Sequence, residues 1–328
     1  MRESENGSLT IREIGRIIAG GYADHQEVRK STMNRIRDLV RHKNEGIPFG
    51  VLEDKKEIKN FDSKYSDRNL PTLVEEMFAQ GKLNEEESDY LLKALELAKK
   101  AFSLEESHKS PMKTYISQES LWEKFLSHIP GIGPVLAAKL LASFGNCERY
   151  ERVSSLWRHC GLHLVCPTCT ERVDGKVFSL VANSDGRCPN CQSIAISPKR
   201  KKGCQIDFDV RRRSLVWNIA KSLIKQKSPV YYEIYLREKE RQLQRVFAKG
   251  ELKKIYGSSY KEEDTTLKLG HADSRALRKM IKIFLQHYWV AARELANLPT
   301  TEPYVKDKLG HSDIISWQEV LKKNGVVV

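Results

Sequence analysis

Four cysteines in two closely spaced pairs are the clearest chemical signal in the sequence. Cys166 and Cys169 form one Cys-x-x-Cys pair, Cys188 and Cys191 form the second, and residues 170–187 separate them. A two-residue gap lets both sulfurs of a pair face one ion, and two pairs complete a tetrahedral thiolate set. The spacing therefore predicts a zinc ion bound by all four cysteines. Because such a site has no open coordination position, we expect a structural and not a catalytic metal.

The segment between the two pairs predicts a small zinc ribbon. Asp174-Gly175 lies between alternating apolar residues, which is a hairpin signal. The alternatives for the four cysteines are a pair of disulfides or a chance spacing. Nothing at the N-terminus resembles a secretion signal, so we expect a cytoplasmic, reducing location, which disfavours disulfides.

A glycine turn offers a second kind of chemistry, the binding of phosphate by backbone groups. Residues 130–134 read Pro-Gly-Ile-Gly-Pro between predicted helices at 121–129 and 135–144. The two glycines let the backbone approach a phosphate, and N–H groups at a helix start form an anion site. We interpret this as a helix-hairpin-helix that contacts the DNA backbone without reading sequence. The alternative is an ordinary helical turn with glycines at a cap.

Clusters of lysine and arginine provide the remaining candidate contacts with phosphate. Two runs follow the second cysteine pair, and a helix predicted at 273–298 carries cations on the face opposite its apolar residues. We expect that cationic face to point outwards, although charge runs are commonly just solvated. The predicted nucleic-acid-binding residues are Gly131, Ile132, Gly133, Lys199, Arg200, Lys201, Lys202, Arg211, Arg212, Arg213, Arg275, Arg278, Lys279 and Lys282.

Composition agrees with a polyanionic partner. The 328 residues carry a formal net charge of +13, with 40% hydrophobic and 30% charged residues. A basic excess of this kind points to nucleic acid, and the sequence favours DNA over RNA. No apolar run approaches the about 18 residues that a membrane span needs, so no membrane partner is expected.

The elements that must position these residues are mainly helices. We predict a helix from residue 11 to about 42 that breaks at Gly20-Gly21, a helix at 72–80, and a longer one capped by Asn84. Further helices are predicted at 209–226 and 230–249, followed by a loop at 250–270, the helix at 273–298 capped by Asp273, and a short helix at 314–323.

The expected fold is therefore mainly α, with a helix-hairpin-helix DNA-binding core and an inserted small β zinc ribbon. We predict five parts: a helical module at 1–115, the hairpin at 116–163, the ribbon and basic loop at 164–203, a helical region at 204–298, and a tail with a short helix at 299–328.

The order of the motifs resembles the C-terminal domain of insertion-sequence transposases that carry an N-terminal RuvC-like nuclease domain of the DEDD type. The resemblance spans about residues 118–296, with matches at 130–133, 161–162, 211–213, 228–229 and 278–279. It implies DNA strand transfer by a serine nucleophile. Ser197 is the nearest candidate and Ser193 the second, while an ordinary loop serine is the alternative.

Two departures from that family shape the functional hypotheses. The zinc ribbon is an insertion, and the N-terminal half shows no nuclease-like pattern of strands and acidic residues. The first hypothesis is a DNA-binding protein of transposase type. The second is an active recombinase that uses Ser197 with a partner nuclease chain, and the third is a structured-RNA-binding protein. A homo-oligomer is a further expectation.

Overall fold

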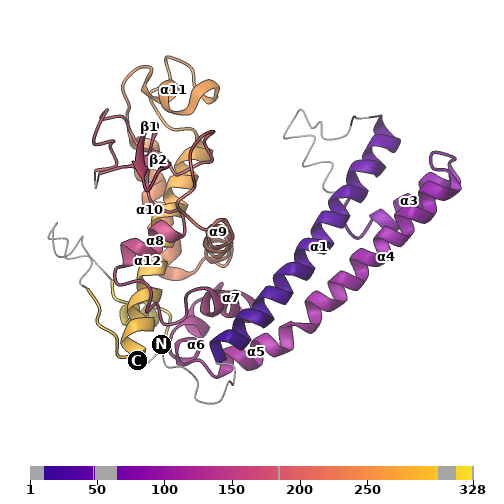
Figure 1. The fold of residues 1–328 in the computed structure, drawn as a ribbon, viewed down its shortest axis with the longest axis horizontal. Coiled ribbons are helices and arrows are strands. Elements are labelled where there is room, and N and C mark those ends of the chain that lie inside the picture. Colours follow the sequence, from indigo (N-terminus) through magenta and orange to yellow (C-terminus); the bar gives the residue numbers. More distant parts are fainter. Residues whose placement is uncertain (1–10, 47, 49–64, 184, 302–314, 327–328) are drawn as a thin grey trace. The chain divides into compact units, whose positions relative to one another are not determined.

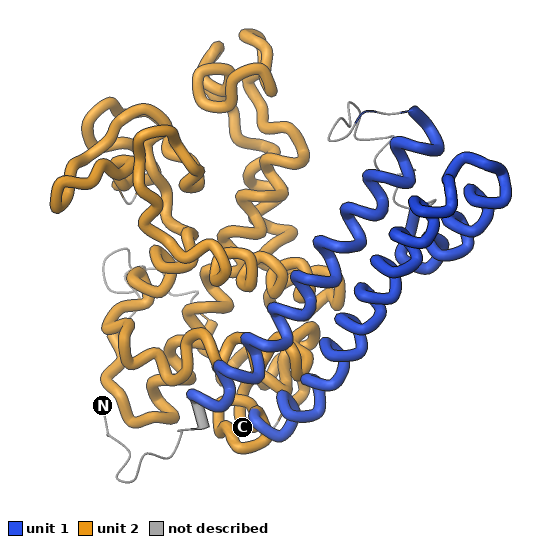
Figure 2. The backbone as a smooth tube through the Cα atoms, turned by 45° about the vertical axis from the view of Figure 1, so that its right-hand side comes forward, with its two compact units in different colours: residues 1–115 blue, residues 116–328 orange. Residues whose placement is uncertain are grey.

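The computed structural model describes residues 11–46, 48, 65–183, 185–301 and 315–326. The chain forms two compact units, residues 1–115 and 116–328 (Figures 1 and 2). Most of the described residues are helical, and the described strands form one two-stranded sheet. The prediction of a mainly α fold with a small β insert is confirmed.

Unit 1 is built around two long helices packed side by side. The main elements are α1 (Ile11–Glu45), α3 (Leu70–Ala79), α4 (Glu85–Ser107) and, at the unit boundary, α5 (Lys109–Ser117). Helices α1 and α4 bury an apolar core between them, and α3 closes one end of it. The Asn84 side chain accepts a hydrogen bond from the Glu87 N–H at 2.8 Å, which confirms the predicted cap of α4.

The predicted break at Gly20-Gly21 is wrong, because α1 continues through it. A Cβ atom on Gly15 would lie 2.3 Å from the Tyr115 ring, and one on Gly21 would lie 2.6 Å from the His108 ring. These glycines leave room for aromatic rings that pack against α1. A close approach of side chains, and not a turn, therefore explains them.

Unit 2 packs its helices around one central helix, α12 (Leu269–Leu295). Trp289 and Tyr288 of α12 are buried, and their polar atoms donate hydrogen bonds to the carbonyls of Tyr150 and Gly145, both at 2.8 Å. The surrounding elements are α6 (Ser120–Lys124), the 3-10 helix η1 (Leu126–His128), α7 (Pro134–Phe144), α8 (Val153–His159), α9 (Val210–Lys225), α10 (Pro229–Gln244), α11 (Glu251–Tyr256), the 3-10 helix η2 (Gly257–Ser259) and α14 (Trp317–Lys323).

The sheet of unit 2 is the hairpin that the sequence predicts. Strand β1 (Val165–Val173) pairs antiparallel with β2 (Lys176–Val181). Asp174 and Gly175 connect them with φ values of 48° and 74°. Two successive positive φ values are the signature of a type I′ hairpin turn, which Asp-Gly adopts readily.

Two further local predictions in unit 2 are wrong. Residues 250–270 are not a loop, because they contain α11 and η2. Leu252 of α11 and Tyr260, which follows η2, join a small apolar cluster. Asp273 is not the cap of α12, which begins at Leu269. Its carboxylate instead accepts hydrogen bonds from Tyr235 and from Lys239.

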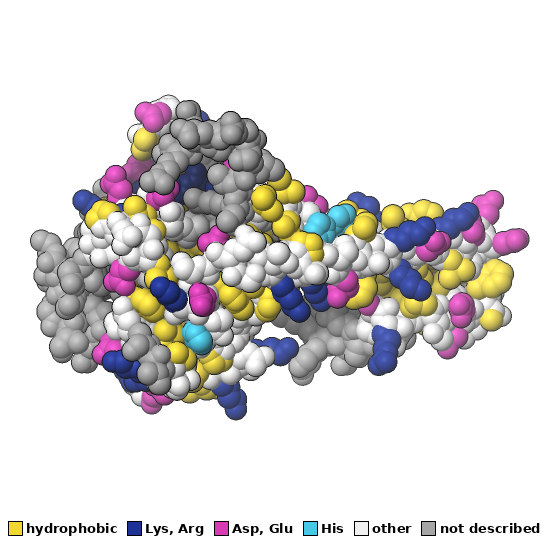
Figure 3. All heavy atoms as spheres, turned by 90° about the horizontal axis from the view of Figure 1, so that it is seen from below, with side chains coloured by type: hydrophobic (Ala, Val, Ile, Leu, Met, Phe, Trp, Pro, Cys, Tyr) yellow, Lys and Arg dark blue, Asp and Glu magenta, His cyan; other side chains and the backbone are white. Residues whose placement is uncertain are grey.

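Charged and apolar side chains are mixed on the surface. On the face drawn in Figure 3, yellow apolar side chains stand among blue and magenta charged ones. Exposed apolar residues of unit 1 include Ile17 and Tyr90, each 63% exposed. Among the residues that the structure describes, no helix combines the length and the hydropathy needed to cross a bilayer.

Candidate metal centre and nucleic-acid interface

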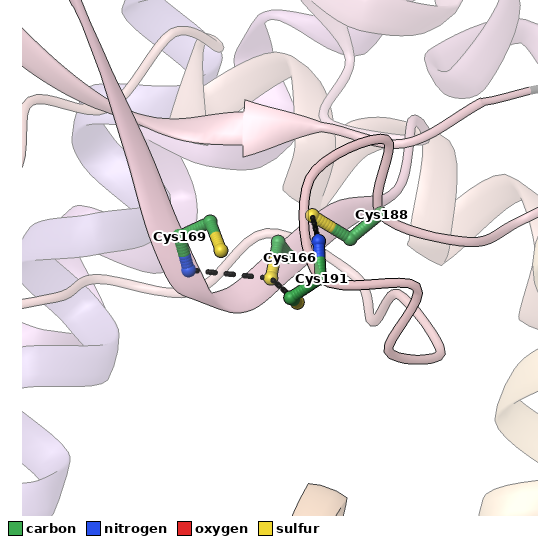
Figure 4. Close-up of side chains that lie close together, drawn as sticks. All are labelled: Cys166, Cys169, Cys188 and Cys191. Carbon is green, nitrogen blue, oxygen red and sulfur yellow. Dashed lines mark hydrogen bonds between the residues drawn. The ribbon is translucent and has the colours of Figure 1, made fainter.

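The four cysteines come together at the base of the ribbon. Their sulfurs lie within 4.8 Å of one another, and Cys166 Sγ is 3.6 Å from Cys191 Sγ (Figure 4). Thiolates bound at about 2.3 Å to one tetrahedral ion are about 3.8 Å apart. The arrangement can therefore bind a metal ion through all of Cys166, Cys169, Cys188 and Cys191.

Hydrogen bonds within each pair of cysteines favour thiolates. The Cys169 N–H donates to Cys166 Sγ at 3.2 Å, and the Cys191 N–H donates to Cys188 Sγ at 3.5 Å. Contacts with the hydroxyl and the N–H of Ser193 lower the pKa of Cys191 to about 6. Burial raises the pKa of Cys188 to about 11. A bound cation would supply the charge that lets all four sulfurs ionise together.

The ribbon is joined to the segment that carries Ser197 and the first basic run. We call residues 197–202 the basic segment. Val165 and Ile196 exchange backbone hydrogen bonds of 2.8 and 2.9 Å just before this segment begins. Farther along, Lys201 Nζ donates to the carbonyl of Thr168 at 2.8 Å. Thr168 lies between the first two cysteines, so the metal cluster and the basic segment share one local framework.

The two candidate serines have different surroundings. Ser193 Oγ is 3.3 Å from Cys191 Sγ, so this serine contacts the sulfur atom of one of the four clustered cysteines and helps to position it. Ser197 is half-buried at the start of the basic segment. Its hydroxyl makes no hydrogen bond with any residue that the structure describes, and no general base is paired with it there.

The glycine turn packs against α9. Gly131 has a φ of 100°, and a Cβ atom there would lie 3.0 Å from the Ser222 carbonyl oxygen. The Ser222 hydroxyl donates to the Gly131 carbonyl at 2.7 Å. Ile132 is only 4% exposed and fills the space beneath the turn. The first of the flanking helices is short, since α6 ends at Lys124 and the 3-10 helix η1 follows.

The start of α7 faces an open cleft. Gly133 is the exposed N-cap of α7, and no side chain caps this helix end. The cleft of about 640 Å³ beside it is lined by residues 127–136 together with Ser222 and Gln226 of α9. We call it the turn cleft. The described residues of its lining include no aspartate or glutamate, so none of them competes for the N–H groups that an anion would use.

A second cleft lies farther along α9, and we call it the basic cleft. It measures about 530 Å³ and has the basic segment on one side and α9 on the other. Its lining includes Lys199, Arg200 and Arg213, which the sequence predicts to contact phosphate. Trp217 and Lys221 complete the α9 wall. Trp217 and Lys221 were not predicted. Their spacing of four residues on one helix face was the signal available in the sequence.

The three arginines at the start of α9 take separate roles. Arg211 is exposed. Arg212 pairs with the carboxylate of Asp209, which caps α9 by accepting from the Arg212 N–H at 2.9 Å. Arg213 Nη1 donates to the carbonyls of Gly161 and Pro198, both at 3.0 Å, and burial lowers its pKa. Arg213 thus anchors the basic segment.

The cations of α12 do not form the outward face that the sequence predicts. Arg275 is half-buried against Tyr256, and Lys279, which is exposed, pairs with Glu238 at 2.8 Å. Lys282 lies 4.0 Å above the Trp157 ring, and burial followed by the charge of Arg278 lowers its pKa to about 8. Neighbouring elements pack around Arg275 and Lys282, and Lys279 is held in an ion pair, so these three cations contact other parts of the protein.

Arg278 is the exception among these cations because no residue in the described part of the chain pairs with it. Burial, and then the nearby charge of Arg275, lower its pKa to about 10. It forms no ion pair with any carboxylate of the described residues. Glu238 is already shared between Arg241 and Lys279, and although burial would raise its pKa, these hydrogen bonds lower it to about 2.

Residues 123–167 match the family model described as Transposase IS116/IS110/IS902 family. The match begins in α6, covers the glycine turn, α7 and α8, and ends within the first cysteine pair. It supports a segment like the C-terminal domain of these transposases. No curated protein and no solved structure matches the chain.

Proposed function

We propose that this chain is a DNA-binding protein of transposase type. It contacts the phosphate backbone through the glycine turn, acting as a helix-hairpin-helix, and through the basic segment and α9. The matched segment, residues 123–167, contains the glycine turn. The cations of α12 predicted from sequence are assigned to support and not to this surface.

One observation carries the proposal: α9 borders both clefts. Lys221 lines the basic cleft, and the next residue, Ser222, lines the turn cleft. Among the described residues, no aspartate or glutamate lines either cleft. The nearby carboxylates Asp207 and Asp209 are held by Arg158, His163 and Arg212. A strip without negative charge, with N–H donors at one end and cations at the other, complements a phosphate backbone.

The four cysteines hold a structural zinc ion in this proposal. Four thiolates leave no position for water or substrate, so zinc would supply no catalysis. Its role is to fix the ribbon, and through the Lys201–Thr168 hydrogen bond to fix the basic segment. The metal would therefore act on DNA binding indirectly, by holding cations in place.

The experiment is a titration of a fluorescent DNA duplex with wild type and with the double variant Arg200→Ala, Lys221→Ala. We expect the double variant to bind at least about tenfold more weakly, because two phosphate contacts are lost. The control is Lys93→Ala, Lys100→Ala, which removes two cations from the exposed face of α4, where they pair with Asp89 and Glu96. It changes the net charge equally.

Equal weakening by both double variants would contradict the proposed surface, because net charge alone would then explain binding. Absence of duplex binding by the wild type would contradict the proposed function itself. A structured RNA of similar length is titrated in parallel. Tighter binding of that RNA would replace DNA by RNA as the ligand.

Strand transfer by Ser197 is the second candidate function. One observation favours it: Ser197 precedes Pro198, whose carbonyl is held by Arg213, so the hydroxyl lies beside cations that could clamp a phosphate. The cysteine cluster is the single group of metal-ligating side chains found in the described residues, and in this candidate function a partner chain supplies the nuclease site. Trapping of a covalent DNA adduct, and its loss in Ser197→Ala, tests this candidate.

A further inference from the structure

The basic cleft contains more than the cations needed to hold a DNA backbone. Its volume of about 530 Å³ falls in the range of small-molecule sites. Besides Lys199, Arg200 and Lys221, its lining includes the aromatic side chains of Phe208 and Trp217. A groove that contacts only phosphates does not require an indole ring.

The cations of the cleft are available to a ligand. Lys199, Arg200 and Lys221 are exposed, and they form no hydrogen bond or ion pair with any residue in the described ranges. Like charges gathered around a concave surface repel one another unless an anion lies between them. Arg213 donates a hydrogen bond to the Pro198 carbonyl and so fixes the backbone just before Lys199 and Arg200.

The two aromatic rings differ in availability. Arg213 lies 4.9 Å from the centre of the Phe208 ring, so one face of that ring is taken. Trp217 is half-buried, and in the described part of the chain no ring or cation stacks on it and no acceptor meets its indole N–H. By contrast, Trp157 and Trp289 donate their N–H groups to backbone carbonyls. Trp217 therefore presents an unused aromatic face inside a cationic cleft.

We propose that the basic cleft binds an unpaired nucleotide of a nucleic-acid strand. The base stacks on Trp217, and the flanking phosphates contact Lys221 and Arg200. This inference rests on the proposed function and adds the class of structure recognised, a gap, flap or open junction. Bases inside a continuous duplex have both faces covered by their neighbours, whereas an unpaired base can offer one face to an aromatic ring.

The neighbouring turn cleft supports this assignment. Ser222 borders the turn cleft and Lys221 the basic cleft, so the two clefts adjoin successive residues of α9. A duplex end at the turn and an unpaired nucleotide at Trp217 would together occupy both clefts. Asn218, which also lines the basic cleft, offers an amide that can donate to and accept from a base edge.

The test uses a DNA duplex with a one-nucleotide unpaired position that contains 2-aminopurine, whose fluorescence falls when it stacks on an aromatic ring. We expect wild type to quench this fluorescence. Trp217→Leu should abolish the quenching and weaken binding of the DNA with the unpaired nucleotide at least about fivefold, since stacking contributes about 1–3 kcal/mol per base. Binding of the intact duplex should change less than about twofold.

Two variants guard against a trivial loss of folding. Trp217→Phe keeps an aromatic face and should retain most of the quenching. Trp122→Leu removes a half-buried tryptophan of α6 outside the cleft, and it should quench like wild type. An RNA strand with the same unpaired base is a parallel arm, and quenching by DNA, RNA or both agrees with the proposal.

Two results would overturn the inference. One is quenching by Trp217→Leu equal to that by wild type, and the other is the absence of quenching by wild type with every strand. If wild type still binds intact duplex in the second case, the proposed function survives and only the nucleotide site is lost. If duplex binding is absent too, the proposed function fails with it.

Discussion

His287 is a buried residue whose chemistry sets a pH limit on the stability of unit 2. Its ring lies between the Tyr231 hydroxyl at 2.9 Å and the Ile315 carbonyl at 2.8 Å. Nε2–H donates to that carbonyl, so Nδ1 is the acceptor for the tyrosine hydroxyl. Burial lowers the pKa of His287 to about 4. Between about pH 4 and pH 6.5 the ring is therefore neutral in the folded protein, whereas in the unfolded chain it is cationic.

The prediction is a loss of stability as the pH falls. Between the ordinary pKa of 6.5 and about 4, the unfolded chain binds a proton at His287 and the folded protein does not. The free energy of unfolding should therefore decrease by up to about 3 kcal/mol across that range. Urea unfolding from pH 7 to pH 4 measures this. His287→Gln should show a shallower decrease, and an equal slope would show that other groups cause it.

Lys282 gives a pH dependence of the same sign, but in the alkaline range. Its ammonium is half-buried over Trp157, and burial lowers its pKa from 10.5 to about 8. Between those values the unfolded chain carries the extra proton, so stability should rise with pH. At pH 7 the buried charge costs stability, which the contact with Trp157 offsets only in part.

We predict that Lys282→Met raises the free energy of unfolding at pH 7 by about 1 kcal/mol or more. The variant should also lose the rise in stability above pH 8, while its affinity for duplex DNA stays within about twofold of wild type. Urea unfolding and DNA titration check these points. A tenfold loss of affinity in a folded Lys282→Met protein would return Lys282 to the DNA surface.

At the scale of elements, the glycines of α1 separate what a sequence pattern can predict from what packing decides. The sequence shows adjacent glycines, which commonly break a helix, but it does not show the aromatic rings that approach them. A Cβ atom on Gly21 would lie 2.6 Å from the His108 ring, whereas a Cβ atom on Gly20 would have no neighbour within 4 Å among the described residues. Two neighbouring glycines thus have different constraints.

This contrast gives a paired prediction. Gly20→Ala should stabilise unit 1 by up to about 1 kcal/mol, because alanine favours the helix and has space there. Gly21→Ala should destabilise it, because the methyl group would displace the His108 ring. Thermal unfolding of both variants decides the matter. Equal stabilisation by both would show that the ring moves away without cost.

Helix α12 shows the same limit from the opposite direction. A helical pattern correctly separates its apolar side from its cationic side, and Phe284 and Tyr288 are fully buried. It does not reveal that α8 and α10 cover the cationic side as well, as the Lys282–Trp157 and Lys279–Glu238 contacts show. Periodicity describes one helix, whereas burial of a cation depends on the neighbours that fold against it.

The hairpin with its four cysteines is the element that the sequence predicts most fully. Cysteine spacing and the Asp-Gly turn are local signals, and both agree with the structure described for residues 165–183 and 185–191. We predict one zinc ion per chain in the purified protein and its loss in Cys188→Ser. Structural zinc contributes about 10–16 kcal/mol of binding free energy in small domains, so the ribbon of this variant should unfold.

Metal analysis and NMR of the ribbon amides test this prediction. Cys204→Ser is the control, because Cys204 lies outside the cluster of four sulfurs. It should keep the metal. Wild type without zinc, or a ribbon that stays folded after chelation, would contradict the assignment.

At the scale of the whole molecule, the basic composition favours a polyanionic partner, but it does not show which residues contact that partner. The net charge of +13 is spread over the sequence. The fold determines which cations remain available: Lys221 lines a cleft with Arg200, while Lys279 and Arg212 are paired with carboxylates. The proposed nucleic-acid surface along α9 therefore depends on tertiary packing.

The central claim, that phosphates bind along α9, is tested most directly by the salt dependence of duplex DNA binding. If about six phosphates are contacted, a plot of log affinity against log salt concentration should have a slope near −5. The double variant Arg200→Ala, Lys221→Ala should reduce the magnitude of that slope by about two, and Lys93→Ala, Lys100→Ala should leave it unchanged. A flat plot for wild type, or the same slope in wild type and the first double variant, would contradict the account.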